Sequence, residues 1–346
     1  MPHPPESTRL GTSQTALEAK VAHLSRAESY PEQTAAVEVI QTHMSFVFLT
    51  DRLAYKLKKP VRYDFLDFGT IEARHTDCLE EIRLNRRLAR DVYLDVVPLT
   101  QGPAGRLRLG GDGAAVDWLV KMRRLARDLM LDRAISARQV SKDAVRRFML
   151  VLAQFYRRAE PVGMAPARYL QRFERDIRSN HRELSLRDYG LPRTLVESIT
   201  TRQLDLLRRE ATLLEQRAAQ GKIVEGHGDL RPEHVFLGRE PVFIDCLEFN
   251  RDWRLLDPVD EIAYLSLECE HAGATWIGEA ALEIYSERNG DAPAAPLVRF
   301  YKSVRASLRA KLSVWHLRDH LESAAREKWV DRAHGYLELA HRYAVP

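Results

Sequence analysis

Two aspartates, Asp229 and Asp245, lie in a stretch of short apolar runs and turns that covers 223–249. The pattern predicts three short strands, over 223–224, 235–237 and 242–244. Asp229 would then lie on a loop between two strands, and Asp245 would follow the end of another. Such a pair suits phosphoryl transfer, because one carboxylate must lie near the acceptor hydroxyl while another holds magnesium against the phosphates.

The order of these residues matches the kinase signature H-x-D-x-x-x-x-N followed by a metal-binding aspartate. His227 and Asp229 begin the motif, position 234 is its last residue, and Asp245 follows it. With the Leu-Arg-Pro that comes next, the HGD triplet resembles the aminoglycoside phosphotransferase-like kinases, which share the protein-kinase fold and include choline and fructosamine kinases. The resemblance implies that Asp229 is the catalytic base, that His227 braces the loop and that Asp245 binds Mg²⁺.

The chain departs from that family at one position of the motif, where His234 replaces the asparagine. An imidazole is a poor ligand for magnesium and a better one for zinc or manganese. A second metal ion would therefore bind weakly at His234, or another group such as Glu248 would hold it. The alternative interpretation of the whole stretch is an ordinary turn in which both aspartates cap loops.

Length and composition are those of an ordinary globular protein. The chain has 346 residues, 45% of them hydrophobic and 29% charged, which is enough for a sizeable core in two lobes. The net charge of +4 is too small to indicate nucleic-acid binding on its own. The cysteines, Cys78, Cys246 and Cys269, are too widely spaced to predict a disulfide framework or a zinc site.

The sequence also lacks the signals of membrane insertion and export. No run approaches the ~18 apolar residues of a membrane span. Residues 1–14 are polar and rich in proline, without the apolar core of a signal peptide. We therefore expect a disordered tail over 1–14 and a cytoplasmic protein without a membrane or nucleic-acid partner.

A nucleotide site is predicted in the first third of the chain. The alternating runs 45–49 and 53–57 indicate a β-hairpin. Kinases cover the phosphates with a glycine-rich loop at this place, but neither that loop nor G-x-x-x-x-G-K-[ST] occurs in the chain. The turn 42–45 takes its place, with its backbone N–H groups and the hydroxyls of Thr42 and Ser45 as candidate phosphate contacts.

A lysine on the second of these strands is the next candidate. Ala54-Tyr55-Lys56 matches the V-A-I-K pattern of the third kinase strand, which implies that Lys56 contacts the nucleotide phosphates. Lys58 competes with it, because alternate residues of a strand point the same way. The alternative for both lysines is a solvated edge strand.

A kinase lysine is oriented by a glutamate on the following helix. The charged segment 70–90 predicts such a helix, and it offers Glu80 and Glu81 near its middle. Glu81 begins E-I-R-L-N-R-R-L, which loosely resembles the corresponding helix of the family. We therefore choose Glu81 as the partner of Lys56.

The rest of the pattern predicts an α+β, protein-kinase-like fold. Two short helices within 15–43, a strand over 91–99, and 106–109 paired with 115–120 across the glycine-rich turn 110–113 complete a β-rich N-lobe over 15–122. A larger helical C-lobe follows over 123–346. Val120 and Met122 fall where kinases place the hinge, whose backbone groups hydrogen-bond the adenine.

Asp257-Pro258 predicts a helix that begins after the catalytic stretch, because proline is favoured in a first helical turn. The segment resembles the family's D-P-x-x-D-L-A run, and we take Asp260 as the second aspartate, which braces the catalytic loop from below. The alternative is that Asp257 and Asp260 are first-turn acids that complement the helix dipole. Both interpretations make the two residues structural.

The helix predicted over 296–319 carries a basic stripe formed by Lys302, Arg305 and Arg309. Such a stripe is usually a solvated face. The alternative is an anion site for the acceptor, since arginine is suited to bidentate contacts with carboxylate or phosphate.

Together these features predict an ATP- and Mg²⁺-dependent kinase that phosphorylates a hydroxyl of a small molecule, with an anionic acceptor as the more specific hypothesis. Two alternatives come from other functional classes. The first is a nucleotide-binding pseudokinase that serves as an interaction module, and the second is a kinase-fold enzyme that modifies protein. No oligomeric state is predicted.

Overall fold

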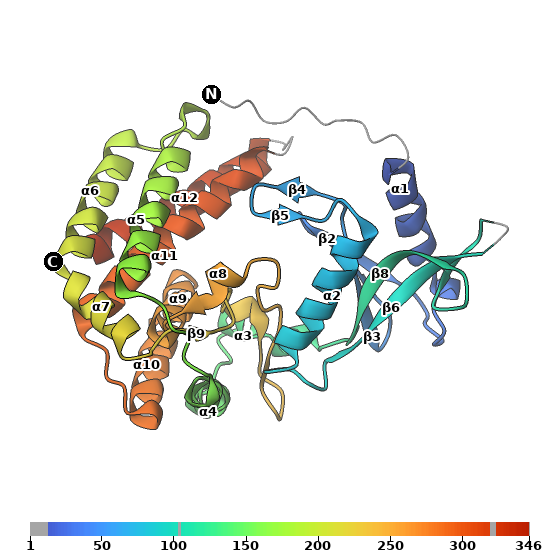
Figure 1. Cartoon of the computed structure of the whole chain (residues 1–346), viewed down its shortest axis with the longest axis horizontal. Helices are drawn as coiled ribbons and strands as arrows, with labels where there is room; N and C mark the ends of the chain where they lie inside the picture. The colour runs from blue at the N-terminus through green and yellow to red at the C-terminus, as the bar shows by residue number, and fades with distance from the viewer. Residues whose placement is uncertain (1–12, 103–104, 319–322, 346) are drawn as a thin grey trace. The chain divides into compact units, whose positions relative to one another are not determined.

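The computed structural model describes residues 13–102, 105–318 and 323–345, so that most of the tail predicted over 1–14 lies outside the described residues. The chain forms two compact units. Unit 1 consists of Met1–Ala126 with Ile244–Asn250, and unit 2 consists of Arg127–Phe243 with Arg251–Pro346. The predicted α+β class is confirmed, since unit 1 is built around a sheet and unit 2 is helical (Figure 1).

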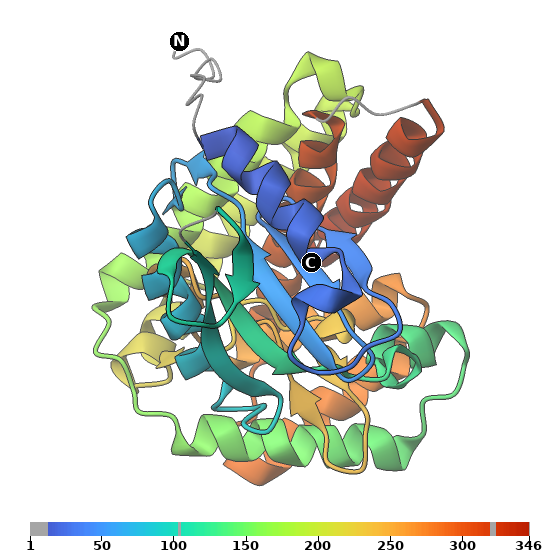
Figure 2. The same cartoon turned by 90° about the vertical axis from the view of Figure 1, so that its right-hand side faces the viewer.

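The sheet of unit 1 is antiparallel and has the strand order β1-β2-β3-β8-β6-β7 (Figure 2). Its strands are β1 (Glu38–Gln41), β2 (Ser45–Leu49), β3 (Leu53–Lys58), β6 (Tyr93–Gln101), β7 (Leu107–Leu109) and β8 (Ala114–Arg123). The predicted hairpin of 45–49 with 53–57 is confirmed as β2–β3. The strand β3 lies inside the sheet, so the alternative that its lysines lie on a solvated edge strand is wrong.

Two predictions for unit 1 are corrected by the pairing of the strands. The second short helix expected within 15–43 is instead the edge strand β1, which is held by its backbone ladder to β2. The segment 106–109 does not pair with 115–120, because the long strand β6 lies between β7 and β8 and pairs with both. Local turn chemistry at 110–113 suggested a hairpin, but the long-range pairing with β6 decided the order.

Two helices lie on opposite faces of this sheet, α1 (Ser13–Leu24) and α2 (Ile71–Asn85). Alternation along β3 explains the division, since successive side chains of a strand point to opposite faces. Tyr55 and Leu57 share an apolar cluster with Leu24 of α1. Lys56 and Lys58 point to the other face and meet α2.

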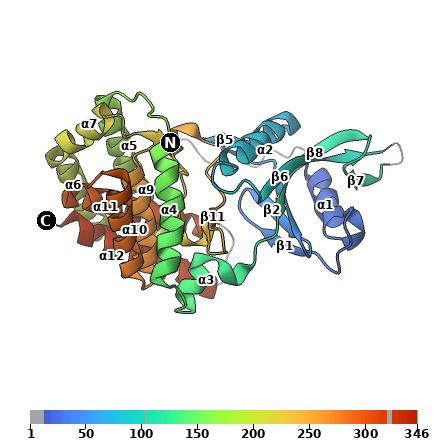
Figure 3. The same ribbon diagram turned by 90° about the horizontal axis from the view of Figure 1, so that it is seen from below.

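Unit 2 is organised around α9 (Pro258–His271), in which every residue from Pro258 to Cys269 is buried. A helix that is buried all round must be surrounded by others, and α9 packs against α10 and α11 (Figure 3). The other helices are α3 (Leu131–Ser136), α4 (Lys142–Arg158), α5 (Pro166–Leu184), α6 (Arg193–Arg209), α7 (Ala211–Ala219), α8 (Arg251–Arg254), α10 (Thr275–Asn289), α11 (Ala295–Trp315) and α12 (Ser323–Ala344).

Within the part of the chain that the structure describes, none of the helices combines the length and the apolar character that crossing a membrane would require.

Candidate active site

The loop with Asp229 is framed by short strands, as the sequence predicts. β9 (Val224–Glu225) pairs with β12 (Leu255–Leu256), and β10 (Val235–Phe236) pairs with β11 (Val242–Phe243). The intervening residues 226–234 therefore form a loop fixed at both ends within unit 2. Its last part is a short 3-10 turn, Pro232–His234.

A buried glutamate of α9 anchors the backbone of this loop. Glu261 accepts hydrogen bonds from the backbone N–H of His227, at 3.0 Å, and from that of Gly228, at 2.5 Å. The Glu261 side chain lies so close to the loop backbone that a Cβ on residue 226 would be 2.7 Å from Glu261 Oε2, which explains why this residue is glycine. Glu261 thus satisfies two backbone donors that would otherwise be buried without partners.

This contact corrects the role predicted for Asp260. Asp260 pairs with Arg305 of α11, with both of its oxygens at 2.8 Å, and the loop is instead braced by the next residue, Glu261. The signal was present in the sequence: in D-P-x-x-D counted from Asp257, the second acid falls at position 261. Asp257 is structural as predicted, because it caps α9 at the N–H of Val259 and pairs with Arg217.

Glu261→Gln is expected to loosen the loop 226–234. The Glu261 carboxylate accepts hydrogen bonds from two backbone N–H groups and from the Tyr156 hydroxyl. In glutamine an NH₂ group replaces one of the two accepting oxygens, so at least one of these buried donors loses its partner. One such loss costs about 1–3 kcal/mol. We expect a lower melting temperature and faster hydrogen exchange at the amides of His227 and Gly228. Asp260→Asn, one residue earlier, is the control: it should lower stability without selectively exposing these two amides.

The carboxylate of Asp229 is held by two side chains of unit 2. Arg231 Nε lies 3.0 Å from Oδ1, and the Tyr264 hydroxyl donates to the same oxygen at 3.3 Å. Burial opposes the charge on Arg231, but Asp229, Tyr264 and Glu233 together outweigh burial and hold the pKa of the guanidinium above its usual value. The Asp229 side chain retains 29% of its exposure, so the carboxylate is oriented but still accessible.

The two histidines of the motif support the loop from within. His227 is fully buried, and its Nδ1 accepts the backbone N–H of Asp229 at 3.3 Å. His234 Nδ1 lies 2.8 Å from the Asp229 carbonyl oxygen; because a carbonyl only accepts, Nδ1 carries the proton. In the neutral ring, Nε2 then accepts from Arg231 Nη2, at 3.2 Å. These contacts favour a bracing role for His234 over the metal role considered from the sequence.

In unit 1 the structure brings together Lys56, Glu81 and Asp245. Lys56 Nζ lies 2.9 Å from Glu81 Oε1 and 2.9 Å from Asp245 Oδ1. Burial opposes the charge on Lys56, but Asp245 and Glu81 outweigh burial and raise the pKa of the ammonium group well above its usual value. Lys56 is therefore a cation at neutral pH, held beside the aspartate predicted to bind metal.

The structure also shows where Lys58 and Glu80, the alternatives to Lys56 and Glu81, lie. Lys58 donates to the second oxygen of Glu81, at 2.6 Å, but only 1% of its side chain is exposed, against 14% for Lys56. Lys56 is therefore the better placed of the two for a phosphate. Glu80 lies on the outer side of α2, where it pairs with Arg83 at 2.7 Å, so Glu81 is the glutamate that faces the lysines.

Asp245 is presented by an unusual backbone conformation. Its φ angle is 61°, in the left-handed region that is uncommon for residues other than glycine. Two buried groups fix the turn: the Tyr93 hydroxyl accepts the N–H of Asp245, and Asn85 Oδ1 accepts the N–H of Cys246, both at 2.9 Å. Neither residue was singled out from the sequence: Tyr93 belongs to no motif, and Asn85 lies within E-I-R-L-N-R-R-L but was given no role there.

In the structure, the other residues predicted to contact the nucleotide make hydrogen bonds within the protein. Ser45 is buried and its hydroxyl lies 2.9 Å from Thr42 Oγ1, so both hydroxyls help to close the turn 42–45. Val120 and Met122 lie inside β8, which is paired with β3 on one side and β6 on the other. Their backbone groups therefore serve the sheet rather than a hinge.

The basic stripe of α11 is neither a solvated face nor an open anion site. Lys302, Arg305 and Arg309 are buried, and each has a carboxylate partner on α9. The pairs are Lys302–Glu270, Arg305–Asp260 and Arg309–Glu268, at 3.4, 2.8 and 3.0 Å. The solvated-face prediction is wrong, and the balanced charges favour bracing between two helices over binding of an anionic acceptor.

No protein-family model matches the chain. Uncharacterized proteins of Mycobacterium tuberculosis and Mycobacterium bovis are similar to it, with 31% identity over 286 residues. The match covers 80% of this chain and 54% of each of these proteins, so the chain spans about half the length of the curated relatives it matches.

Solved structures of two kinds of phosphotransferase are similar in fold. A choline kinase from Streptococcus pneumoniae matches with a TM-score of 0.52 and 16% identity, over 94% of this chain and 98% of the other. The aminoglycoside phosphotransferase APH(4)-Ia matches with a TM-score of 0.50 and 11% identity, over 94% and 99%. The resemblance predicted from the HGD motif is thus confirmed for the fold: the chain has the protein-kinase-like fold of the choline kinase and aminoglycoside phosphotransferase structures.

Proposed function

We propose that the protein is an ATP-dependent phosphotransferase that phosphorylates a hydroxyl group of a small molecule. The observation that carries the proposal is the position of Lys56, whose ammonium group joins Glu81 and Asp245 at 2.9 Å each. A lysine oriented by a helical glutamate beside a metal-binding aspartate is the arrangement with which kinases hold Mg²⁺ and nucleotide phosphates. The fold shared with a choline kinase and an aminoglycoside phosphotransferase supports the same reaction class.

The residues of unit 1 fit a magnesium ion at Asp245. Magnesium prefers carboxylate oxygens, and the Asp245 side chain is 46% exposed, with its Oδ1 beside Lys56. Asp245 would hold the ion there, and the chemistry supplied would be neutralisation of charge on the transferring phosphoryl group. Lys56 then contributes a second positive charge, with which the nucleotide phosphates can form an ion pair.

Asp229 takes the role of the residue that orients and deprotonates the acceptor hydroxyl. Its loop is fixed by Glu261, and its carboxylate is held by Arg231 and Tyr264 while remaining partly exposed. Holding the base in place before the substrate arrives removes an orientational cost from the chemical step.

Contacts with the adenine are assigned to the backbone that follows β8. Within β8 the ladder with β3 and β6 engages the backbone, but the strand ends at Arg123 and the first segment of unit 1 continues to Ala126. Arg124 still donates its N–H to the Arg52 carbonyl oxygen, so residues 125 and 126 replace Val120 and Met122 as the proposed hinge contacts.

The test begins with calorimetric titration of the full chain with ATP, with and without MgCl₂. A library of hydroxyl-bearing metabolites is then screened for ATP consumption, and products are identified by mass. We expect Mg²⁺-dependent nucleotide binding and one phosphoryl group transferred per ATP consumed with the correct acceptor. Binding without transfer to any acceptor would favour a nucleotide-binding module, and a mass increase on protein would favour a protein-modifying enzyme.

A further inference from the structure

The second lysine of β3 is surrounded by carboxylates from two separate parts of unit 1. Lys58 Nζ lies 2.6 Å from Asp77 Oδ2 and 2.6 Å from Glu81 Oε2, both on α2. It also lies 2.5 Å from Glu248 Oε1, in the returning segment Ile244–Asn250. Glu81 and Glu248 accept hydrogen bonds from the ammonium group, whereas Asp77 is a close ion partner without a hydrogen bond to it.

We propose that Lys58 is a positioning residue that fastens both α2 and the segment Ile244–Asn250 to β3, and thereby presents Glu81 and Asp245 to Lys56. Glu81 is shared, with Oε1 on Lys56 and Oε2 on Lys58, so fixing one oxygen fixes the other. Glu248 is only three residues beyond Asp245, so the Lys58 contact holds the short segment that carries the predicted metal ligand.

This role explains why a kinase-like site uses two lysines on one strand. In the structure Lys56 pairs directly with Asp245, at 2.9 Å. If Lys56 turns to phosphates and Asp245 to a metal ion, that direct pair is weakened during nucleotide binding. The Lys58–Glu248 pair does not involve either of these groups, so the segment remains attached to β3 throughout. This part of the inference rests on the proposed function, whereas the fastening itself does not.

The cluster also has the composition of a cation site, which the ammonium group fills. The carboxylate oxygens of Asp77, Glu81 and Glu248 lie within 4.8 Å of one another. Without a positive charge among them, three buried or half-buried carboxylates would repel one another in a region of low polarity. The ammonium group of Lys58 supplies that charge as part of the chain, so the charge does not depend on the concentration of a metal ion.

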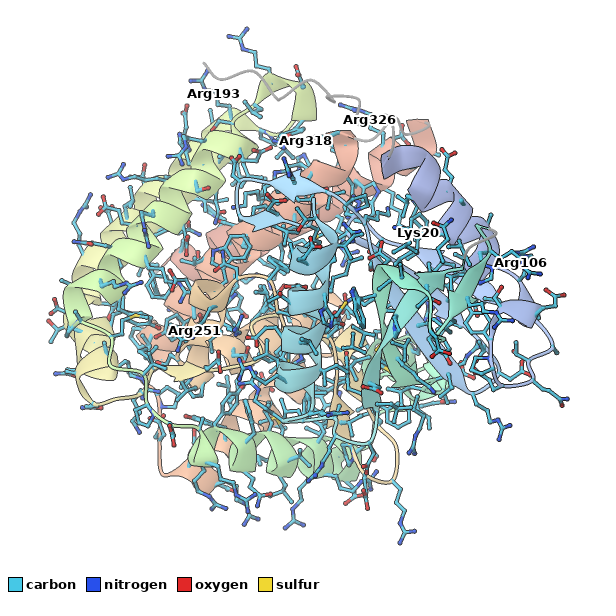
Figure 4. All side chains as sticks on the ribbon, turned by 45° about the vertical axis from the view of Figure 1, so that its right-hand side comes forward. Lys20, Arg106, Arg193, Arg251, Arg318 and Arg326 are labelled. Atoms are coloured by element: carbon cyan, nitrogen blue, oxygen red, sulfur yellow. The ribbon has the colours of Figure 1, made fainter. Side chains whose placement is uncertain are left out.

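The test compares Lys58→Met with a matched control, Lys20→Met, in the full chain. Lys20 is also a buried lysine of unit 1; it lies on α1 (Figure 4) and pairs with Asp117 at 2.8 Å. Both variants remove one buried ammonium group, so both should lower the melting temperature. Only Lys58→Met removes the link to Glu81 and Glu248.

Two measurements separate positioning from general destabilisation. The first is the rate of hydrogen exchange at the backbone amides of Asp245 and Cys246, measured in EDTA without nucleotide. These amides donate hydrogen bonds to the Tyr93 hydroxyl and to Asn85 Oδ1, respectively. We expect exchange about tenfold faster in Lys58→Met and unchanged in Lys20→Met. The second is the affinity for Mg·ATP, which should fall about tenfold in Lys58→Met alone.

The outcomes distinguish this inference from the proposed function. Unchanged exchange at Asp245 and Cys246 in Lys58→Met overturns the positioning role, whatever the nucleotide affinity. If exchange is faster in Lys58→Met but the wild type does not bind Mg·ATP, the positioning role stands and the proposed kinase function is contradicted. If Lys58→Met does not fold, Glu248→Gln replaces it, because Lys58 then keeps Asp77 and Glu81; faster exchange at the two amides is again required, and wild-type exchange overturns the inference. Lys58→Arg should restore slow exchange in part, since it returns a cation with several donors.

Discussion

Asp229→Ala is expected to abolish measurable turnover while leaving Mg·ATP binding close to that of the wild type. The carboxylate is proposed to act on the acceptor hydroxyl, and general-base and positioning effects are worth roughly 10²–10⁴-fold in rate. The contacts of Asp229 are with Arg231 and Tyr264 of unit 2, and Arg231 retains Glu233 as a partner at 2.5 Å. The fold should therefore survive the change. Initial rates and calorimetric nucleotide affinity check the two halves of this expectation.

Glu233→Ala is the matched control for Asp229→Ala. It removes the other carboxylate on Arg231, from a side chain that is 36% exposed, and leaves the Asp229 carboxylate in place. Its rate should stay near that of the wild type. A near-normal rate in Asp229→Ala would show that Asp229 is not the base, and an equal loss in both variants would show that Arg231 pairing, rather than the Asp229 carboxylate, is what matters.

Asp245→Asn is expected to weaken Mg·ATP binding as well as the rate. The change removes a charged ligand proposed for magnesium and one of the two carboxylates that hold Lys56. Loss of groups that merely support a metal ligand already costs about 10–100-fold in metal affinity or activity, so at least that loss is expected here. Nucleotide affinity as a function of Mg²⁺ concentration is the measurement.

Glu80→Gln provides the comparison for Asp245→Asn within unit 1. Glu80 carries the same charge but pairs with the exposed Arg83 on the outer side of α2. Its Mg²⁺ dependence should match that of the wild type. If Asp245→Asn also shows the wild-type Mg²⁺ dependence, Asp245 does not hold the metal.

The sequence predicted the parts of the site whose chemistry is local. The spacing from His227 to Asp245 indicated strands, a loop and a turn, and β9, β10 and β11 lie where it placed them. Alternation along β3 put Lys56 and Lys58 on one face, which the contacts with Glu81 bear out. These inferences needed only the periods of strands and helices and the residue types that turns require.

What the sequence did not reveal depends on which elements meet. The arginines of α11 form a stripe that on an isolated helix faces water; only the burial of α9 beneath them turns the stripe into ion pairs. The partner of β7 could not be read from the turn at 110–113, because the choice between β6 and β8 is made by long-range pairing. Glu261 was overlooked for a different reason, since its motif was recognised but counted one residue short.

The return of Ile244–Asn250 to unit 1 has a consequence for the order of events during synthesis. The ribosome completes Met1–Ala126 first, yet Asp245 and Glu248 are made only after the whole of Arg127–Phe243. Asp245 follows Lys56 by 189 residues, and Glu248 follows Lys58 by 190. At about 5–20 residues per second, the lysines of β3 spend roughly 10–40 seconds without two of their carboxylates. The nascent unit 1 can form its sheet in that time, but its charge cluster is completed only when the later segment emerges. The proposed nucleotide site therefore cannot be completed before Ile244–Asn250 has been synthesised.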